Sequence, residues 1–302
     1  MLLDTASLYF RAFYGVPDNF HAADGTPVNA VRGLLSFINT LVSEYRPTHL
    51  ACCWDNDWRP QWRVDLIPSY KAHRVEEVVP GAPDVEEVPD PLEVQVPLIL
   101  EVLAAFGIAV VGADGYEADD VIGTLAYRAT MPTDVVTGDR DLFQVIDDAR
   151  EVRVLYVARG VAKHERVTDE VVRAKYGVSA AQYADFAALR GDTSDGLPGV
   201  PGVGEKTAAG LLASYPDIPT LLQAAADPTS QLAPGPRRKL LDAVDYLAVA
   251  PKVCEVATDL DLPGDDALVL PRTPVAPEAL AELARRLDLE STCARLVNTL
   301  NR

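Results

Sequence analysis

The chain has 302 residues, 48% of them hydrophobic, and a formal net charge of −18 at pH 7. This length and composition predict a folded protein with enough core for two lobes. No apolar run reaches the roughly 18 residues of a membrane span, and the opening MLLDTASLYF lacks the basic and long apolar regions of a signal peptide. We therefore expect a cytoplasmic protein without a membrane partner. The acidity argues at first against nucleic acid, yet net charge describes the mean field and not one groove.

Short runs of apolar and β-branched residues alternate with helical patterns in the first half of the chain. The runs predict buried strands over 1–3, 48–54, 108–111, 134–137 and 152–157. Apolar residues at helical spacing predict helices over 28–45, 97–106 and 119–129. This alternation is typical of an α/β fold with a mostly parallel central sheet flanked by helices.

The pattern changes after residue 166. Helices are expected over 168–176 and 180–189, the second opened by a capping box at Ser179 and Gln182. Further helices follow, separated by Pro and Gly breaks. We therefore predict an α/β core over 1–166 and a helical lobe over 167–302. Segment 75–91 carries four prolines, six acids and no Lys or Arg, which predicts a mobile acidic loop.

Carboxylates follow several predicted strands. The carboxyl ends of parallel strands meet at one sheet edge, where ligands bind in open α/β folds. Helix-dipole or turn chemistry could explain each acid alone, but together they would repel one another unless cations lay among them. Oxygen ligands favour Mg²⁺ or Mn²⁺, and two such ions can clamp a phosphodiester. The predicted metal-binding residues are Asp4, Asp55, Glu117, Asp119, Asp120, Asp139, Asp141, Asp192 and Asp195.

The segment LPGVPGVGEKTAAGLL, residues 197–212, predicts a glycine-rich turn between two helices. Gly199, Gly202 and Gly204 allow a tight turn and a close approach, and the helix that begins near Glu205 offers free N–H groups to an anion. The segment matches neither a P-loop nor a dinucleotide-binding fingerprint. Helix, hairpin and helix is instead a layout that grips a DNA backbone without reading bases.

Basic residues are sparse, and we expect them to contact DNA. Lys71 and Arg74 in SYKAHR follow the strand before Asp55 by a distance that can return them to the same crevice. Candidate backbone contacts outside the crevice are Arg63, Lys206, Thr207, Arg237, Arg238 and Lys239.

These motifs together resemble the 5′-nuclease (flap endonuclease) superfamily, and most of all the 5′→3′ exonuclease domain of bacterial DNA polymerase I, here as a free-standing chain. The resemblance rests on LLDTASLYFRAFY, YKAHR, GYEADD, TGDRDLFQVI and LRGDTSDGLPGVPGVGEKTA in this order. It implies a two-metal hydrolysis of DNA phosphodiesters that leaves 5′-phosphate and 3′-hydroxyl ends. It also implies work in replication and repair on 5′ flaps, nicks, gaps and RNA primers, by a protein that we expect to be a monomer.

The resemblance also assigns roles to residues. One metal is implied near Asp4, Asp55, Glu117 and Asp119, and a second near Asp139, Asp141 and Asp192. Asp120 and Asp195 are implied to support these sites or to hold an extra ion. Arg11, Lys71 and Arg74 are implied to contact the reacting phosphate. The hairpin from Gly199 to Lys206 would hold duplex backbone, with K⁺ as an implied bridging ion.

Three other functions compete with this interpretation. A metal-dependent ribonuclease of the PIN type shares acids at the sheet edge but lacks the hairpin and the helical lobe. A non-catalytic helix–hairpin–helix DNA-binding protein would not need Asp4, Asp55, Asp139 and Asp141 together. A phosphatase that forms an aspartyl-phosphate needs Asp-x-Asp after the first strand, and Asp4–Ala6 reads DTA instead.

Overall fold

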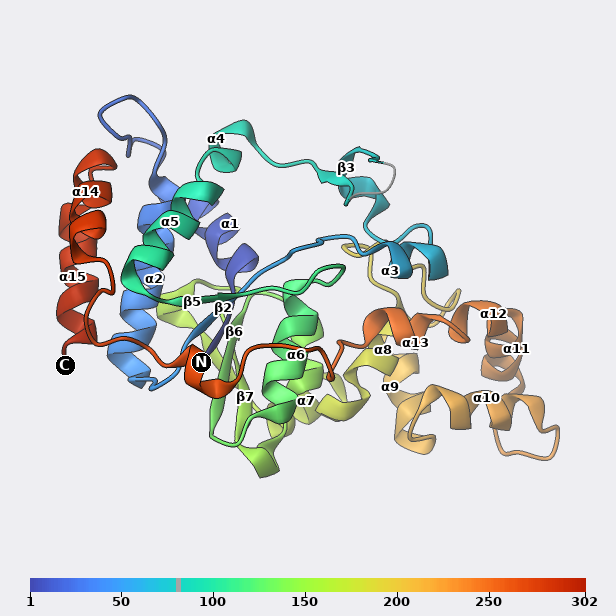
Figure 1. The fold of residues 1–302 in the computed structure, drawn as a ribbon. Coiled ribbons are helices and arrows are strands. Elements are labelled where there is room, and N and C mark those ends of the chain that lie inside the picture. Colours follow the sequence, from blue (N-terminus) through green and yellow to red (C-terminus); the bar gives the residue numbers. More distant parts are fainter. Residues whose placement is uncertain (80–82) are drawn as a thin grey trace.

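The computed structural model describes residues 1–79 and 83–302. A six-stranded sheet with the order β5-β2-β1-β6-β7-β8 forms its centre (Figure 1). The parallel strands are β1 (Leu2–Asp4), β2 (Ala51–Cys53), β5 (Ala109–Val111), β6 (Thr133–Thr137) and β7 (Val152–Tyr156). The edge strand β8 (Glu165–Val167) pairs antiparallel with β7. The predicted α/β class and all five predicted strands are confirmed, and β8 is an addition.

Each face of the sheet is buried in its own hydrophobic core. Leu2, Val135 and Val154 point into one core, whereas their neighbours Leu3 and Val136 point into the other. This alternation follows from the two-residue period of a strand. Because both faces are buried, the strands read in the sequence as continuous apolar runs.

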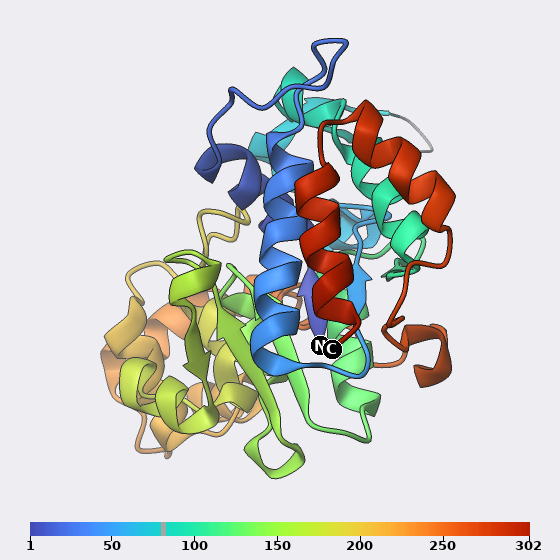
Figure 2. The same cartoon turned by 90° about the vertical axis from the view of Figure 1, so that its left-hand side faces the viewer.

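One face is covered by α1 (Thr5–Gly15), α2 (Asn29–Tyr45), α5 (Val96–Phe106), α14 (Pro277–Arg286) and α15 (Glu290–Leu300). Figure 2 shows α2 and α15 side by side, and Thr299 donates a hydrogen bond to Asn39 at 2.7 Å. The chain end thus returns to the α/β core. The expectation that all helices after residue 167 form the second lobe is wrong for α14 and α15, because Leu280 and Leu296 bury against the α2 side of the sheet.

The other face is covered by α6 (Ala118–Arg128), and its core continues into the helical lobe. That lobe holds α7 (Asp169–Tyr176), α8 (Tyr183–Arg190), α9 (Glu205–Ser214), α10 (Ile218–Ala226), α11 (Pro234–Asp242), α12 (Val244–Leu247) and α13 (Ala250–Cys254) (Figure 1). Phe143 and Tyr183 stack edge to face at 5.4 Å across the junction of core and lobe. The capping box at Ser179 is present, although its first turn is a 3-10 turn (Ala180–Gln182) and the α-helix begins at Tyr183.

The predicted acidic loop contains regular structure. Strands β3 (Val75–Glu77) and β4 (Val85–Glu86) pair antiparallel, between α3 (Gln61–Leu66) and α4 (Asp90–Glu93). Arg59 forms an ion pair with Asp84, and Trp58 Nε1 donates to the Asp84 carbonyl at 2.6 Å. The segment expected to be a mobile loop therefore contains a paired and anchored ladder, β3 and β4, on either side of residues 80–82, which lie outside the described residues.

The described part of the chain contains no helix with both the length and the apolar character that a membrane crossing requires. Cys52, Cys53 and Cys293 are buried and Cys254 is half-buried, and all four are free thiols.

Candidate active site

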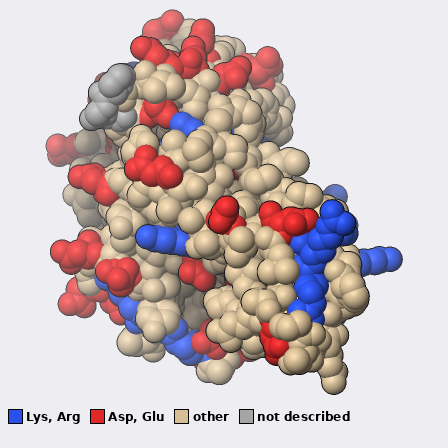
Figure 3. Space-filling view, turned by 90° about the vertical axis from the view of Figure 1, so that its right-hand side faces the viewer, with Lys and Arg blue, Asp and Glu red and all other residues tan. Residues whose placement is uncertain are grey.

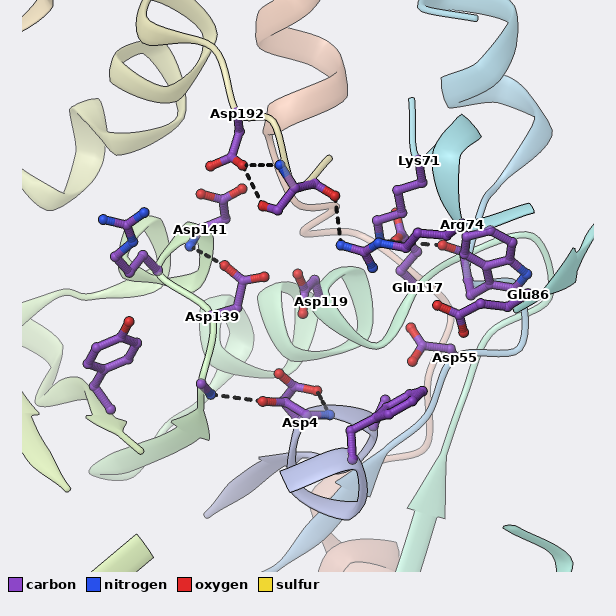
Figure 4. A pocket seen from close by; sticks show the side chains of 18 residues that line it. Asp4, Asp55, Lys71, Arg74, Glu86, Glu117, Asp119, Asp139, Asp141 and Asp192 are labelled. Atoms are coloured by element: carbon purple, nitrogen blue, oxygen red, sulfur yellow. Dashed lines mark hydrogen bonds and ion pairs between the residues drawn. The ribbon is translucent and has the colours of Figure 1, made fainter. Parts of the chain in front are cut away.

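A pocket of about 490 Å³ opens at the carboxyl edge of the sheet (Figure 4). Its charged lining residues come from seven separate stretches of the chain. The acids are Asp4, Asp55, Glu86, Glu117, Asp119, Asp139, Asp141 and Asp192, and the cations are Lys71, Arg74 and Arg140. Fully ionised, this lining carries an excess of five negative charges. Seven of the nine predicted metal-binding residues therefore meet in one pocket, as the strand-end argument predicts.

Asp4 is fixed where β1 passes directly into α1. Its carboxylate caps the helix by accepting from the Ser7 N–H at 3.1 Å, and it also accepts from the Thr137 hydroxyl at 2.6 Å. The same hydroxyl accepts from the Asp139 N–H at 2.8 Å. Thr137 at the end of β6 thus ties the aspartates of two neighbouring strands to one another.

Asp139, Asp141 and Asp192 form one wall of the pocket in Figure 4. The opposite wall carries Asp55, Lys71 and Arg74. The Asp141 N–H donates to the Asp139 carboxylate at 2.9 Å, which holds the turn after β6. Asp192 forms an ion pair with Arg190 at 3.0 Å and accepts from the Ser194 N–H at 2.9 Å. Since Arg190 ends α8, this ion pair joins the pocket to the helix that leads into the glycine-rich hairpin.

Burial and crowding disturb the protonation of the pocket acids. Burial raises the pKa of Asp4 to about 7, and the charges of Asp55 and Asp139 act in the same direction. Burial also raises the pKa of Asp119 well above its ordinary value, and Asp4 and Asp139 add to it. Burial likewise raises the pKa of Asp141 well above its ordinary value, and the charge of Asp139 adds to this effect. These acids are therefore a group that would be stabilised as carboxylates by bound cations.

A divalent ion suits this donor set, because hard oxygen ligands converge on a half-buried space without enough cationic side chains to neutralise them. Asp119 lies near the middle of the pocket between Asp4 and Asp139 (Figure 4). Among residues 1–79 and 83–302, no three His, Cys, Asp or Glu side chains already surround one point closely enough to hold an ion. The residues thus have the chemistry that a hard divalent ion prefers, but the described side chains are not arranged as a closed coordination shell.

Glu117 has a different environment from the other acids. Its carboxylate forms ion pairs with Lys71 and with Arg63, and accepts from the Tyr70 hydroxyl at 2.7 Å. Burial acts to raise the pKa of Glu117, but the charges of Lys71 and Arg63 outweigh it and hold the pKa below its ordinary value. Glu117 is therefore already neutralised by the protein, unlike Asp4 and Asp119.

Two predicted contacts are wrong in this structure: Arg63 as a DNA contact and Asp120 as a direct metal ligand. Arg63 is 2% exposed and lies in ion pairs with Glu117 at 2.5 Å and Asp120 at 2.7 Å, so it cannot reach a DNA backbone. Asp120 is fully buried and accepts from Arg63 and from the Ala257 N–H at 2.9 Å. Asp120 therefore does not face the pocket, but it supports Glu117, because it accepts from the Glu117 N–H at 3.2 Å and shares Arg63 with it.

Lys71 and Arg74 reach the pocket, as their spacing predicts. Lys71 has a left-handed backbone (φ 47°), and its N–H donates to the Asp195 carbonyl at 2.9 Å. Arg74 donates to the Ser194 carbonyl at 2.8 Å and lies 3.4 Å from the Asp195 carboxylate. Asp195 thus lies beside the pocket, where it orients Arg74.

Arg11 lies beside the pocket and not in its lining. Its guanidinium donates to the Ala158 carbonyl at 3.1 Å, and its buried Nε has no hydrogen-bond partner in the described part of the chain. A Cβ on Gly138, which lines the pocket, would lie 3.2 Å from Arg11 Nη2. Arg11 is therefore close enough to act on the pocket from behind the turn after β6.

The sequence analysis missed several residues of the lining. Glu86 and Arg140 add charge, and Phe10, Trp58 and Tyr156 add aromatic surface. Arg140 stands between two predicted ligands in TGDRD, so its position alone could have indicated it. Glu86 gave no such signal, because its place depends on the pairing of β3 with β4.

The hairpin between α8 and α9 has the predicted layout, but its glycines serve different purposes. Gly199 has φ +66°, and a Cβ there would lie 2.5 Å from the Gly191 N atom. Its N–H donates to the Tyr246 hydroxyl at 3.2 Å, so Gly199 serves internal packing and not phosphate binding. Gly204 caps α9 and has open space around it, and Lys206 is exposed beside it.

The basic residues of α11 also have different environments. Arg237 donates to backbone carbonyls from Ala224 to Leu232, so it closes the end of α10 and is wrong as a DNA contact. Lys239 donates to the Gly202 carbonyl at 2.7 Å and supports the hairpin. The Arg238 side chain is 86% exposed. Figure 3 shows Lys and Arg gathered in a stripe along one side of this face, whereas acids are scattered over the rest.

Comparison with known proteins identifies the family that combines this fold with an acidic pocket. Residues 1–177 match the family model of the 5′-3′ exonuclease N-terminal resolvase-like domain, and residues 178–274 match that of the 5′-3′ exonuclease C-terminal SAM fold. The chain belongs to the 5′-3′ exonuclease family. It is therefore a nuclease of the hydrolase class, and the predicted family is confirmed.

Individual relatives agree. The chain is 60% identical over 300 residues to a 5′-3′ exonuclease of Streptomyces coelicolor, with 99% of each chain covered. It is 45% identical over 226 residues to DNA polymerase I of Mycobacterium bovis, covering 74% of this chain and 24% of the polymerase. Among solved structures, the bacteriophage T5 D15 flap endonuclease in complex with DNA and metal ions has a TM-score of 0.62 at 14% identity and covers 100% of this chain and 99% of that one.

Proposed function

We propose that this chain is a metal-dependent 5′ nuclease that hydrolyses DNA phosphodiesters at flaps, nicks, gaps and primer-bearing 5′ ends. The observation that carries the proposal is the pocket in which eight carboxylates meet Lys71 and Arg74 at the carboxyl edge of the sheet. The DNA and metal ions in the complex of the T5 relative support it. The products would be 5′-phosphate and 3′-hydroxyl ends, in replication and repair. The cytoplasmic location and the monomeric state stay predictions.

The carboxylates on the two walls would hold two divalent ions, Mg²⁺ or Mn²⁺. Among the predicted ligands, Asp4, Asp55, Asp119, Asp139 and Asp141 suit this role best, because no Lys or Arg forms an ion pair with them in the described part of the chain. Ions bound there would supply an activated water and stabilisation of the departing oxygen. Thr137 and Ser7 keep Asp4 oriented, and Asp139 orients the Asp141 backbone.

Lys71 and Arg74 act on the phosphate from the other wall. Lys71 Nζ donates to the Trp58 carbonyl at 3.3 Å and pairs with Glu117, so its charge is already in place before substrate arrives. A fixed cation of this kind stabilises the charge that develops on a phosphate more than a mobile one does. Arg74 is oriented in the same way by Ser194 and Asp195.

The hairpin would hold the duplex next to the pocket. Gly204 leaves the start of α9 open to a close approach, and Lys206 adds a positive charge beside it. Phosphate contacts of this kind position DNA without reading its sequence. A K⁺ ion bridging hairpin carbonyls and phosphate belongs to the same proposal.

The test is incubation with 5′-labelled flap, nicked and blunt DNA in the presence of Mg²⁺, Mn²⁺ or a chelator. We expect cleavage near the flap junction with either metal, none with chelator, and products that a ligase can join without a kinase. Equal cleavage in chelator would contradict the metal proposal. RNA of the same structures is tested in parallel. Cleavage of the RNA but not of the DNA would favour the ribonuclease alternative, against which the hairpin and the helical lobe argue.

A further inference from the structure

Glu86 brings a carboxylate into the pocket from a segment outside the sheet. It lies on β4, and Figure 4 shows it on the wall with Asp55, Lys71 and Arg74. In the described part of the chain the Glu86 carboxylate has no hydrogen bond and no ion pair within 4 Å. Its charge therefore acts on whatever passes along this wall.

The position of Glu86 is fixed by residues on either side of it. Glu86 pairs with Val75 across the β3–β4 ladder, and the Glu87 N–H donates to the Arg74 carbonyl at 2.8 Å. The preceding Asp84 is held by Arg59 and Trp58. These contacts tie the backbone of β4 to the segment that carries Arg74, so the Glu86 backbone stays at this wall as long as the ladder is intact.

The neighbouring Glu87 offers a natural contrast. Glu87 directly follows β4, and it is exposed and does not line the pocket. The two residues have the same charge and adjoin in the chain. They differ in position, because the Glu86 side chain lines the pocket and the Glu87 side chain is exposed outside it.

The direction of a bound strand follows from the two walls. Asp192 and Arg190 connect one wall to the hairpin that would hold the duplex, so DNA enters from that side. The reacting phosphate would lie among the carboxylates around Asp119. Any nucleotides 5′ of it then leave along the opposite wall, past Lys71, Arg74 and Glu86.

We propose that Glu86 makes the nuclease discriminate against phosphates that lie 5′ of the bond being cut. This inference rests on the proposed function and concerns its preferred substrate. Each phosphate beyond the reacting one meets a fixed negative charge in a half-enclosed space, where charges interact more strongly than in bulk water. A nick with a 5′-hydroxyl has no such phosphate, a 5′-phosphorylated nick has one, and a five-nucleotide flap has several. The wild type therefore favours short 5′ ends over long flaps.

The test compares Glu86→Gln with wild type on these three substrates. Single-turnover rate at subsaturating enzyme is measured with Mg²⁺ present, over a series of salt concentrations. We expect Glu86→Gln to speed flap cleavage by roughly three- to tenfold at low salt, with a smaller gain on the 5′-phosphate nick and none on the 5′-hydroxyl nick. The gain should shrink as salt rises, because the Debye length falls to about 10 Å at 0.1 M.

Glu87→Gln is the matched control, and it should give a clearly smaller gain on the flap. Glu86→Lys should exceed Glu86→Gln in the same substrate order, which separates charge from a local loss of structure. An equal gain on all three substrates, an equal gain in Glu87→Gln, or a loss of activity that extra Mg²⁺ restores would overturn the inference, the last by making Glu86 a metal ligand. If wild type cleaves none of the substrates, the proposed function itself fails.

Discussion

The carboxylate pocket and the hairpin differ in how the chain treats polar groups. In the pocket, Asp4, Asp119 and Asp141 are crowded and partly buried, and burial raises the pKa of each. At the hairpin, Gly204 and Lys206 are exposed, and space is left open at the start of α9. The contrast teaches that a net charge of −18 does not decide whether DNA binds. Under the proposed function, the pocket would hold cations and the hairpin would offer backbone N–H groups to phosphate.

The comparison predicts that substitutions in the pocket lower the cleavage rate, whereas substitutions at the hairpin lower the affinity for DNA. Asp139→Ala should lower the single-turnover rate by at least 10²–10³, the cost of removing one preorganised charge contact. DNA affinity in the same variant should stay within a few fold, because repulsion of the backbone also falls. Rates are measured with excess enzyme, and affinity by fluorescence polarisation without Mg²⁺.

Asp259→Ala is the control for this variant, since Asp259 is exposed and outside the pocket. It should change neither quantity. If Asp139→Ala cleaved at the wild-type rate, the pocket would not be where the reaction occurs.

Lys71→Ala should also act on the rate, by about 10²-fold, with little change in affinity. The substitution removes a cation from the phosphate wall and leaves Glu117 with one ion pair fewer. Lys175→Ala, which breaks only an exposed pair with Glu165, should have no effect on the rate. An affinity loss as large as the rate loss would place Lys71 among the binding residues instead.

The hairpin should show the reverse behaviour. Gly204→Val should weaken duplex binding by roughly five- to tenfold, because its side chain fills the open space before α9 and blocks backbone approach. The loss should be equal for unrelated DNA sequences, and the rate at saturating enzyme should be unchanged. Gly210→Ala on α9 is the control, since Gly210 also has open space but lies away from the turn. A loss confined to one sequence would argue against backbone recognition.

Two neighbouring arginines sharpen the hairpin side of the comparison. Arg238→Ala should reduce the slope of log affinity against log salt by about 1, as expected for one lost phosphate contact. Arg237→Ala should leave that slope unchanged and lower the melting temperature, because Arg237 bonds to carbonyls at the end of α10. Salt titrations and thermal melts of both variants measure this. Exchange of the two phenotypes would contradict the assignment.

The smallest expected effect is on the pH dependence of stability, and it comes from Asp185 on α8, the helix that precedes the hairpin. Burial raises the pKa of Asp185 to about 6, although the Ile218 N–H donates to it at 3.1 Å. A raised folded-state pKa stabilises the protein below the unfolded value near 4, and this stabilisation is lost as pH rises through 6. Asp185→Asn should therefore gain stability relative to wild type between pH 4 and pH 7 in chemical unfolding. A parallel pH dependence in both proteins would rule out this role.

Local pattern predicted most of the fold and of the pocket. Strand runs ending in Asp4, Asp55 and Asp139 located the sheet edge, since parallel strands place their carboxyl ends together. The sequence could not show that α15 returns to α2, because that packing joins residues some 250 positions apart. The pattern also could not tell Asp120 from Asp119. Both open the same helix, but Asp120 faces Arg63 in the interior and Asp119 faces the pocket.

The same limit explains the errors among the basic residues. Arg63 and Arg237 look like surface charges in the sequence. In the structure, however, Arg63 pairs with Glu117 and Arg237 donates to carbonyls of α10, so both side chains make internal contacts. Glu86 was hidden for a similar reason, since its place in the pocket depends on the β3–β4 ladder. Charge alone does not tell which partner a side chain finds.

The most direct test of the account is a Mn²⁺ titration of the DNA-free protein, with free Mn²⁺ measured by electron paramagnetic resonance. The account predicts that wild type and Gly204→Val each bind about two ions, as two-metal phosphodiester chemistry requires, and that Asp139→Ala binds fewer. This pattern would place the cations in the carboxylate pocket and leave the hairpin to DNA. Equal Mn²⁺ binding by wild type and Asp139→Ala, or no binding at millimolar Mn²⁺, would contradict the claim that the pocket stores its negative charge for metal ions.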